Sequence, residues 1–161
     1  MAITKLITAF AALFTVATAI PAVAADLSST ATVACTTGEP VVTAGYTINY
    51  AQASPTVVAA DAGYQPDPVW GSQHVAATYT YGVPEPKETG FAYAQFKCQY
   101  TCNAAPGGSS FFVQYVGGQT GSFCTCYNDL LKPESFVPLN QTIVGGWNAI
   151  CGVTHPSIGR N

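Results

Sequence analysis

Apolar positions recur with a helical period in the middle of the chain, between Phe91 and Ala105. The positions that recur at intervals of three and four are Phe91, Ala94, Gln95, Cys98, Cys102 and Ala105. This spacing is typical of one face of an α-helix. Glu88 and Thr89 precede the run and Pro106-Gly107-Gly108 follow it, and such residues start and stop helices. We therefore predict a helix over Phe91–Ala105.

Shorter runs rich in β-branched and aromatic residues predict strands. Phe111–Val116 and Ser122–Tyr127 form a pair of such runs, and the Gly-rich stretch Gly117–Gly121 between them predicts a hairpin turn. Further strands are predicted over Thr32–Thr36, Val41–Ala51, His74–Tyr81 and Gln141–Cys151. Together these elements predict an α+β fold, with one main helix packed on an antiparallel sheet.

The stretch Ser54–Gly71 contains four residues that interrupt regular structure, Pro55, Gly63, Pro66 and Pro68. We predict an irregular surface loop there, and the alternative is a disordered segment. Aromatic residues in or near this stretch are exposed candidates for ligand contact.

The first 25 residues predict a signal peptide. Lys5 precedes an uncharged apolar stretch over Leu6–Ile20, and Pro21 and the small residues Ala22–Ala25 follow it as a cleavage-like site. A membrane anchor is the alternative, but a spanning helix requires about 20 apolar residues and a charged flank on its far side. We expect one secreted domain over residues 26–161, extracellular or associated with a cell wall, with no membrane span in the mature chain.

The charge balance argues against nucleic acid as a partner. The chain has five Lys and Arg residues against eight Asp and Glu, a net charge of −3. Nucleic acids and anionic membranes require a basic patch. The basic residues that remain after signal cleavage are scattered: Lys87, Lys97, Lys132 and Arg160.

Six cysteines, all after the cleavage site, predict three disulfides in an oxidising compartment. Cys98 and Cys102 share one helix face, and Cys124 and Cys126 share one strand face. We expect these two pairs to be joined to each other, in either order, which leaves Cys35 for Cys151. A metal site would need a spacing such as paired C-x-x-C, which is absent, so no metal or other cofactor is expected.

The sequence offers no catalytic motif. His74 and His155 are far apart in the sequence and neither lies in a nucleophile motif. Glycoside hydrolysis needs two juxtaposed carboxylates, and the available ones are Asp26, Glu39, Asp61, Asp67, Glu85, Glu88, Asp129 and Glu134. Most of them lie in turns beside Gly or Pro. We expect no enzyme activity, and a small hydrolase is the weaker alternative.

The order of these features resembles the PAN/apple family. The matching segments are Cys35, Phe96–Cys102, Ser110–Val113, Ser122–Tyr127 and Cys151. The resemblance covers residues 90–151 and the isolated Cys35. The family usually has a cysteine before the Phe-containing strand, where this chain has Ser109 and Ser110, so the second cysteine of the C-x-C pair would have to replace it. C-x-C after C-x-x-x-C is also similar to the fungal WSC modules.

The resemblance implies adhesion to carbohydrate or protein at a cell surface. Carbohydrate recognition uses aromatic rings with amide and hydroxyl partners, and Tyr64, Trp70, Tyr79 and Tyr81 are the candidate ligand residues. Asn140-Gln141-Thr142 is a sequon, which makes Asn140 a candidate glycosylation site. The alternative function is a secreted structural or effector protein, stabilised by disulfides, without a carbohydrate site.

Overall fold

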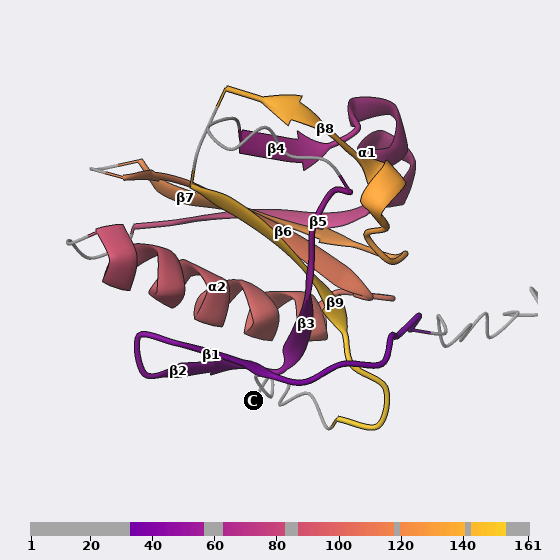
Figure 1. Cartoon of the computed structure of the whole chain (residues 1–161), viewed down its shortest axis with the longest axis horizontal. Helices are drawn as coiled ribbons and strands as arrows, with labels where there is room; N and C mark the ends of the chain where they lie inside the picture. Colours follow the sequence, from indigo (N-terminus) through magenta and orange to yellow (C-terminus); the bar gives the residue numbers. More distant parts are fainter. Residues whose placement is uncertain (1–32, 57–62, 83–86, 118–119, 141–142, 154–161) are drawn as a thin grey trace, which may run out of the picture.

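A five-stranded antiparallel sheet is the middle layer of the structure, a computed structural model that describes residues 33–56, 63–82, 87–117, 120–140 and 143–153 (Figure 1). Its strands lie in the order β3 (Tyr50–Ala53), β9 (Val144–Ala149), β6 (Ser110–Gly117), β7 (Gly121–Tyr127) and β5 (Val75–Tyr81). The predicted hairpin is therefore present as β6 and β7. The segment for which we predict a signal peptide lies outside the described residues.

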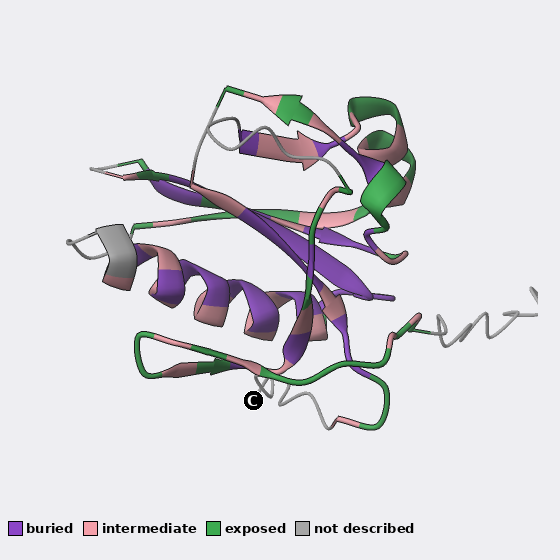
Figure 2. Ribbon diagram, viewed as in Figure 1, coloured by how far each residue is buried: buried purple, intermediate pink, exposed green. Residues whose placement is uncertain are grey.

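One long helix, α2 (Lys87–Ala104), packs on one face of this sheet (Figures 1 and 2). Its buried side follows the predicted stripe, since Ala94, Cys98 and Cys102 have no exposed surface. They lie in one apolar cluster with Phe111 and Trp147 of the sheet. The α+β fold with one main helix on an antiparallel sheet is confirmed, and the helix begins four residues earlier than predicted.

A short hairpin of β1 (Val41–Thr43) and β2 (Tyr46–Ile48) lies below α2 in Figure 1. The prediction of one continuous strand over residues 41–51 is wrong, because the chain turns at Ala44-Gly45. Both residues have positive φ, 46° and 81°, as a type I′ turn requires. Glycine adopts this conformation readily and alanine does not. The sequence therefore indicates the turn at Gly45 but not at Ala44.

Three disulfides connect the layers and the ends of the chain. Cys98 is bonded to Cys124 and Cys102 to Cys126, which joins α2 to β7. Cys35 is bonded to Cys151 across 116 residues. The predicted pairing is confirmed, and the structure gives the order within the helix-to-strand pairs.

The opposite face of the sheet is covered over part of its area by a second layer, visible above the sheet in Figure 1. It consists of a two-stranded sheet, β4 (Gly63–Pro66) with β8 (Phe136–Leu139), the short helix α1 (Pro68–His74), and a 3-10 turn at Pro133–Ser135. A second apolar cluster lies between this layer and the sheet. Its buried members are Ala53, Phe112, Tyr127, Leu131 and Phe136.

The prediction of an irregular loop over residues 54–71 is wrong from Gly63 onward, because β4 and the start of α1 occupy this stretch. Pro66 is the last residue of a strand. Pro68 is in the first turn of a helix, where backbone N–H groups have no partner within the helix, so proline loses no hydrogen bond there. Residues 57–62 lie outside the described residues.

The predicted terminal strands are shorter in the structure. β9 covers Val144–Ala149 of the run predicted over 141–151, and Thr36 forms only an isolated bridge with Ile150. Gln141 and Thr142 are outside the described residues. Within the described ranges, no helix has both the length and the apolar character that crossing a bilayer would require.

Candidate functional site

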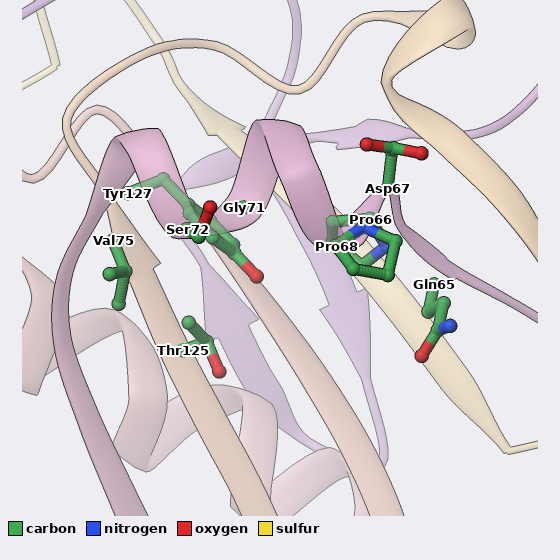
Figure 3. Close-up of a pocket in the computed structure, with 9 residues that line it drawn as sticks. All are labelled: Gln65, Pro66, Asp67, Pro68, Gly71, Ser72, Val75, Thr125 and Tyr127. Atoms are coloured by element: carbon green, nitrogen blue, oxygen red, sulfur yellow. The ribbon is translucent and has the colours of Figure 1, made fainter.

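A cleft of about 300 Å³ opens between the second layer and the edge of the five-stranded sheet (Figure 3). Four elements contribute its walls: β4 with the turn after it, α1, β5 and β7. The lining residues are Gln65, Pro66, Asp67, Pro68, Gly71, Ser72, Val75, Thr125 and Tyr127. Its volume is at the lower end of the range found for small-molecule sites.

The wall formed by α1 is fixed at its beginning by Asp67. The Asp67 Oδ1 accepts hydrogen bonds from the N–H groups of Val69, at 2.9 Å, and Trp70, at 3.0 Å. Its own N–H donates to the Ser135 carbonyl at 2.7 Å, which ties the helix start to the 3-10 turn. Aspartate followed by proline is a favourable sequence for a helix start, because the carboxylate caps free N–H groups and proline fits the first position.

The floor of the cleft is the β7 residue Tyr127, whose ring lies against α1. A side chain added at Gly71 would place its first carbon 3.8 Å from the Tyr127 ring, an ordinary contact distance. The ring centroid of Trp70, the neighbouring residue of α1, lies 5.0 Å from that of Tyr127. Burial raises the pKa of Tyr127 to about 12, and a hydrogen bond with the Thr125 side chain acts in the opposite direction. Tyr127 is therefore a neutral phenol at physiological pH.

The cleft is lined mainly by neutral hydrogen-bonding groups and small apolar surfaces. Of the nine described residues that line it, Asp67 alone carries a charge, and its carboxylate accepts hydrogen bonds from the first turn of α1. Hydroxyl and amide groups come from Gln65, Ser72, Thr125 and Tyr127, and apolar contact surface from the prolines and Val75. Because no lining residue is basic, the site lacks the groups that hold phosphate or carboxylate ligands.

Two of the predicted ligand residues, Tyr64 and Trp70, lie behind this cleft. The Tyr64 ring packs edge-on against Phe112 and Phe136, with centroids at 6.0 and 5.1 Å. Burial raises the pKa of Tyr64, while hydrogen bonds with the Ser54 side chain and the Gly146 backbone lower it. Trp70 and Tyr64 therefore support the wall and floor of the cleft through the second apolar cluster.

The other two, Tyr79 and Tyr81, lie on edge strand β5 with nearly parallel rings, 6.5 Å apart at an interplanar angle of 8°. The Tyr81 hydroxyl is hydrogen-bonded to Thr101 Oγ1 of α2. Since the Thr101 hydroxyl already donates to the Lys97 carbonyl at 2.9 Å, Tyr81 is the donor in this bond. Burial is the main cause that raises the pKa of Tyr81, and the neighbouring Tyr79 adds to that rise. Tyr79 is 39% exposed.

The four predicted aromatic residues do not form one site. Tyr79 is paired with Cys124 and Tyr81 with Ser122. Cross-strand partners in an antiparallel sheet point to the same face, and Cys124 is bonded to α2. Tyr79 and Tyr81 are therefore on the α2 face of the sheet, whereas Tyr64 and Trp70 belong to the opposite layer.

His74, the histidine within the described part of the chain, lies at the end of α1. Its Nδ1 is 3.2 Å from the Asn128 Oδ1, and its ring lies 4.7 Å from the Trp70 ring. The neighbour that orients the imidazole is thus an amide rather than a carboxylate. Among the described carboxylates, Asp67 caps α1 and Asp129 Oδ1 accepts the Leu130 N–H at 2.8 Å. His155, Asp26, Asp61 and Glu85 lie outside the described residues.

Three cysteine sulfur atoms, those of Cys98, Cys102 and Cys124, lie within 4.8 Å of one another. Each of them belongs to a disulfide. Metal coordination by cysteine requires the thiolate, so this group stabilises the fold and has no free ligand atom for an ion.

Sequence reasoning missed the residues that form the cleft itself, notably Gln65, Ser72, Thr125 and Tyr127. The available signal was the helix start at Asp67-Pro68, which would have placed Trp70 on a helix. Asn140 is exposed directly after β8, and its sequon partners are outside the described residues, so its glycosylation stays a prediction.

No protein-family model, curated protein or solved structure matches this chain.

Proposed function

We propose that this protein is a secreted, non-enzymatic binding module of PAN/apple type that recognises a neutral carbohydrate of a cell surface or cell wall in the cleft under α1. The chemistry of the cleft carries the proposal. A sugar ring has apolar C–H surfaces and a rim of hydroxyl groups, and the cleft offers small apolar surfaces beside hydroxyl and amide groups.

The charge of the lining supports a neutral ligand. Without a basic side chain, the cleft offers nothing to balance an anionic group, and Asp67 would repel one. A sugar without carboxylate, sulfate or phosphate groups fits this environment best.

The framework supports secretion and the family resemblance. Three disulfides are typical of proteins that fold in an oxidising compartment. The helix bonded through C-x-x-x-C to the second strand of a hairpin agrees with the resemblance to PAN/apple domains.

Binding to insoluble chitin, β-glucan and cellulose tests the function, and isosteric variants test the site. We expect retention on at least one of these polymers. Thr125→Val and Gln65→Leu each remove a polar group at nearly constant shape, and we expect each to weaken binding about tenfold, the effect of losing roughly one hydrogen bond to the ligand.

Thr47→Val is the matched control, because Thr47 is exposed on β2 and does not line the cleft. Its retention should equal that of the wild type. Retention of both cleft variants at the wild-type level would exclude this site. Failure of the wild type to bind any of the polymers would exclude the carbohydrate ligand and favour the structural or effector role.

A further inference from the structure

Strand β5 has one free edge in the part of the chain that the structure describes. It is the last strand in the order of the sheet and pairs only with β7. Thr78, Tyr79 and Thr80 are exposed. The outward N–H and C=O groups of such a strand form a template for pairing with another chain. The opposite edge differs, because the segment at Gly38 packs closely against Ala51 of β3.

β5 lacks the usual protection of an edge strand. Its sequence, Val-Ala-Ala-Thr-Tyr-Thr-Tyr, contains no charged residue and no proline. Edge strands that stay single commonly carry lysine, proline or a bulge. One irregularity occurs between Val75 and Ala77, which leaves Ala77–Tyr81 in regular register with β7.

Exposed apolar side chains flank this edge on both faces of the sheet. Val75 is 45% and Tyr79 39% exposed on β5 itself, and Phe123, opposite Thr80 on β7, is 42% exposed. Tyr79 is on the α2 face and Val75 and Phe123 are on the opposite face, so an edge-to-edge contact would cover apolar surface on both sides of the sheet.

The regular stretch Ala77–Tyr81 is complementary to itself in antiparallel orientation. Centred on Tyr79, it places Ala77 opposite Tyr81, a small residue beside a large one, and Thr78 opposite Thr80, two residues whose hydroxyls hydrogen-bond across strands. Tyr79 faces its own copy on the two-fold axis. The stretch carries no charged residue, so no repulsion opposes a second copy at this edge, and the paired side chains match in size.

We propose that β5 pairs with β5 of a second copy about a two-fold axis at Tyr79, which joins the two five-stranded sheets into one continuous sheet. Such an isologous contact is closed, because each edge satisfies the other. A two-fold axis between neighbouring antiparallel strands runs perpendicular to the sheet. The α2 layers of both copies therefore lie on one side of the joined sheet, and both clefts open on the other.

Sedimentation velocity of the secreted protein tests the pairing. The wild type is expected to have twice the mass of one chain at high concentration and to dissociate on dilution. Thr78→Lys/Thr80→Lys places lysines opposite each other and should sediment as a monomer. Thr78→Lys/Thr80→Glu places each lysine opposite a glutamate of the other copy, and should restore the dimer.

Thr47→Lys, at an exposed position of β2, is the matched control and should remain dimeric. A wild type that is monomeric at all concentrations would overturn the proposal, as would a dimer that persists in the double-lysine variant. A monomeric lysine–glutamate variant would overturn the register centred on Tyr79.

One consequence of the pairing rests also on the proposed function. Two clefts on one side of a dimer bind a polymer bivalently, which raises apparent affinity without a new contact. The double-lysine variant should be retained less on the insoluble polymer than the lysine–glutamate variant, although both bind a soluble oligosaccharide of the same polymer equally. Equal retention would exclude bivalent binding, while sedimentation alone decides the dimer.

Discussion

The two faces of the five-stranded sheet are covered in different ways. On one face, α2 is joined to β7 by two buried disulfides, and its stripe of small and sulfur-containing side chains has no exposed surface. On the other face, the layer of β4, β8 and α1 is held by aromatic packing around Phe136 and by the cap at Asp67. α1 has no buried residue of its own.

This difference separates a structural face from a face available for binding. The α2 face is fixed covalently and filled by side chains. The candidate cleft lies where α1, which has no buried residue, meets the edge of the sheet. Binding residues commonly lie on weakly packed connections that a rigid scaffold positions. Changes on the α2 face should therefore alter stability, and changes on the opposite face should alter both stability and binding.

Among changes on the two faces, the largest effect is expected from removing a bridge on the α2 face. Cys98→Ala/Cys124→Ala opens a loop with a sequence separation of 26 and should lower the free energy of unfolding by about 3 to 4 kcal/mol. Urea unfolding followed by tryptophan fluorescence measures this loss. The neighbouring bridge, with a separation of 24, is the matched comparison, and Cys102→Ala/Cys126→Ala should cost nearly the same. A loss below about 1 kcal/mol in both would mean that packing alone holds α2.

The next effect lies on the opposite face. Phe136→Ala removes a ring that contacts Tyr64 and approaches Phe112, and should cost about 3 kcal/mol in stability. Carbohydrate retention should fall as well, because β8 holds the strand that leads into the cleft. Phe123→Ala is the control: this ring is 42% exposed, so the loss should stay near 0.5 kcal/mol. Equal losses for the two variants would show that no second core exists.

The arrangement of elements on the α2 face follows from the sequence better than that on the opposite face, and the reason is physical. Cys98 and Cys102 mark one helix face, and Cys124 and Cys126 mark one strand face, so spacing alone restricted how these elements meet. Only the order of pairing stayed open, because either order satisfies the same periodicity.

The elements on the opposite face are not predicted from the sequence, because the prolines that interrupt the pattern belong to those elements. Pro66 and Pro68 indicate breaks in regular structure, yet one ends a strand and the other starts a helix with Asp67 as its cap. The cleft depends on contacts between β7 and α1, which are far apart in the sequence. Periodicity within one segment carries no information about such contacts.

A smaller effect is expected at alkaline pH, again on the cleft side. Burial raises the pKa of Tyr127 to about 12 from the ordinary value of 10.0. The folded protein therefore prefers the neutral phenol. The stability that this preference contributes is complete below about pH 10 and is lost as the pH rises to about 12, a total of roughly 2 to 3 kcal/mol.

Unfolding measured after rapid pH jumps checks this loss in the wild type and in Tyr127→Phe. The variant should lose less stability between about pH 10 and 12, since it lacks the titrating group. Tyr50 and Tyr64, whose pKa values burial also raises, remain in both proteins and cancel in the comparison. An equal loss of stability in the two proteins over this pH range would show that Tyr127 is solvated. The cleft would then be more open than the packing of α1 indicates.

The smallest effect concerns the link between α2 and the edge strand. Tyr81→Phe keeps the ring and removes the hydroxyl that donates to Thr101, so it should cost about 1 kcal/mol. Tyr79→Phe is the control, because Tyr79 is 39% exposed. At a concentration where the protein is monomeric, this variant should have almost the same free energy of unfolding as the wild type. A selective loss at Tyr81 would mean that the covalently fixed helix also positions β5, and with it the strand that forms one wall of the cleft. Equal behaviour of the two variants would instead leave β5 held by its pairing with β7 alone, and the two faces of the sheet would then be independent at this edge.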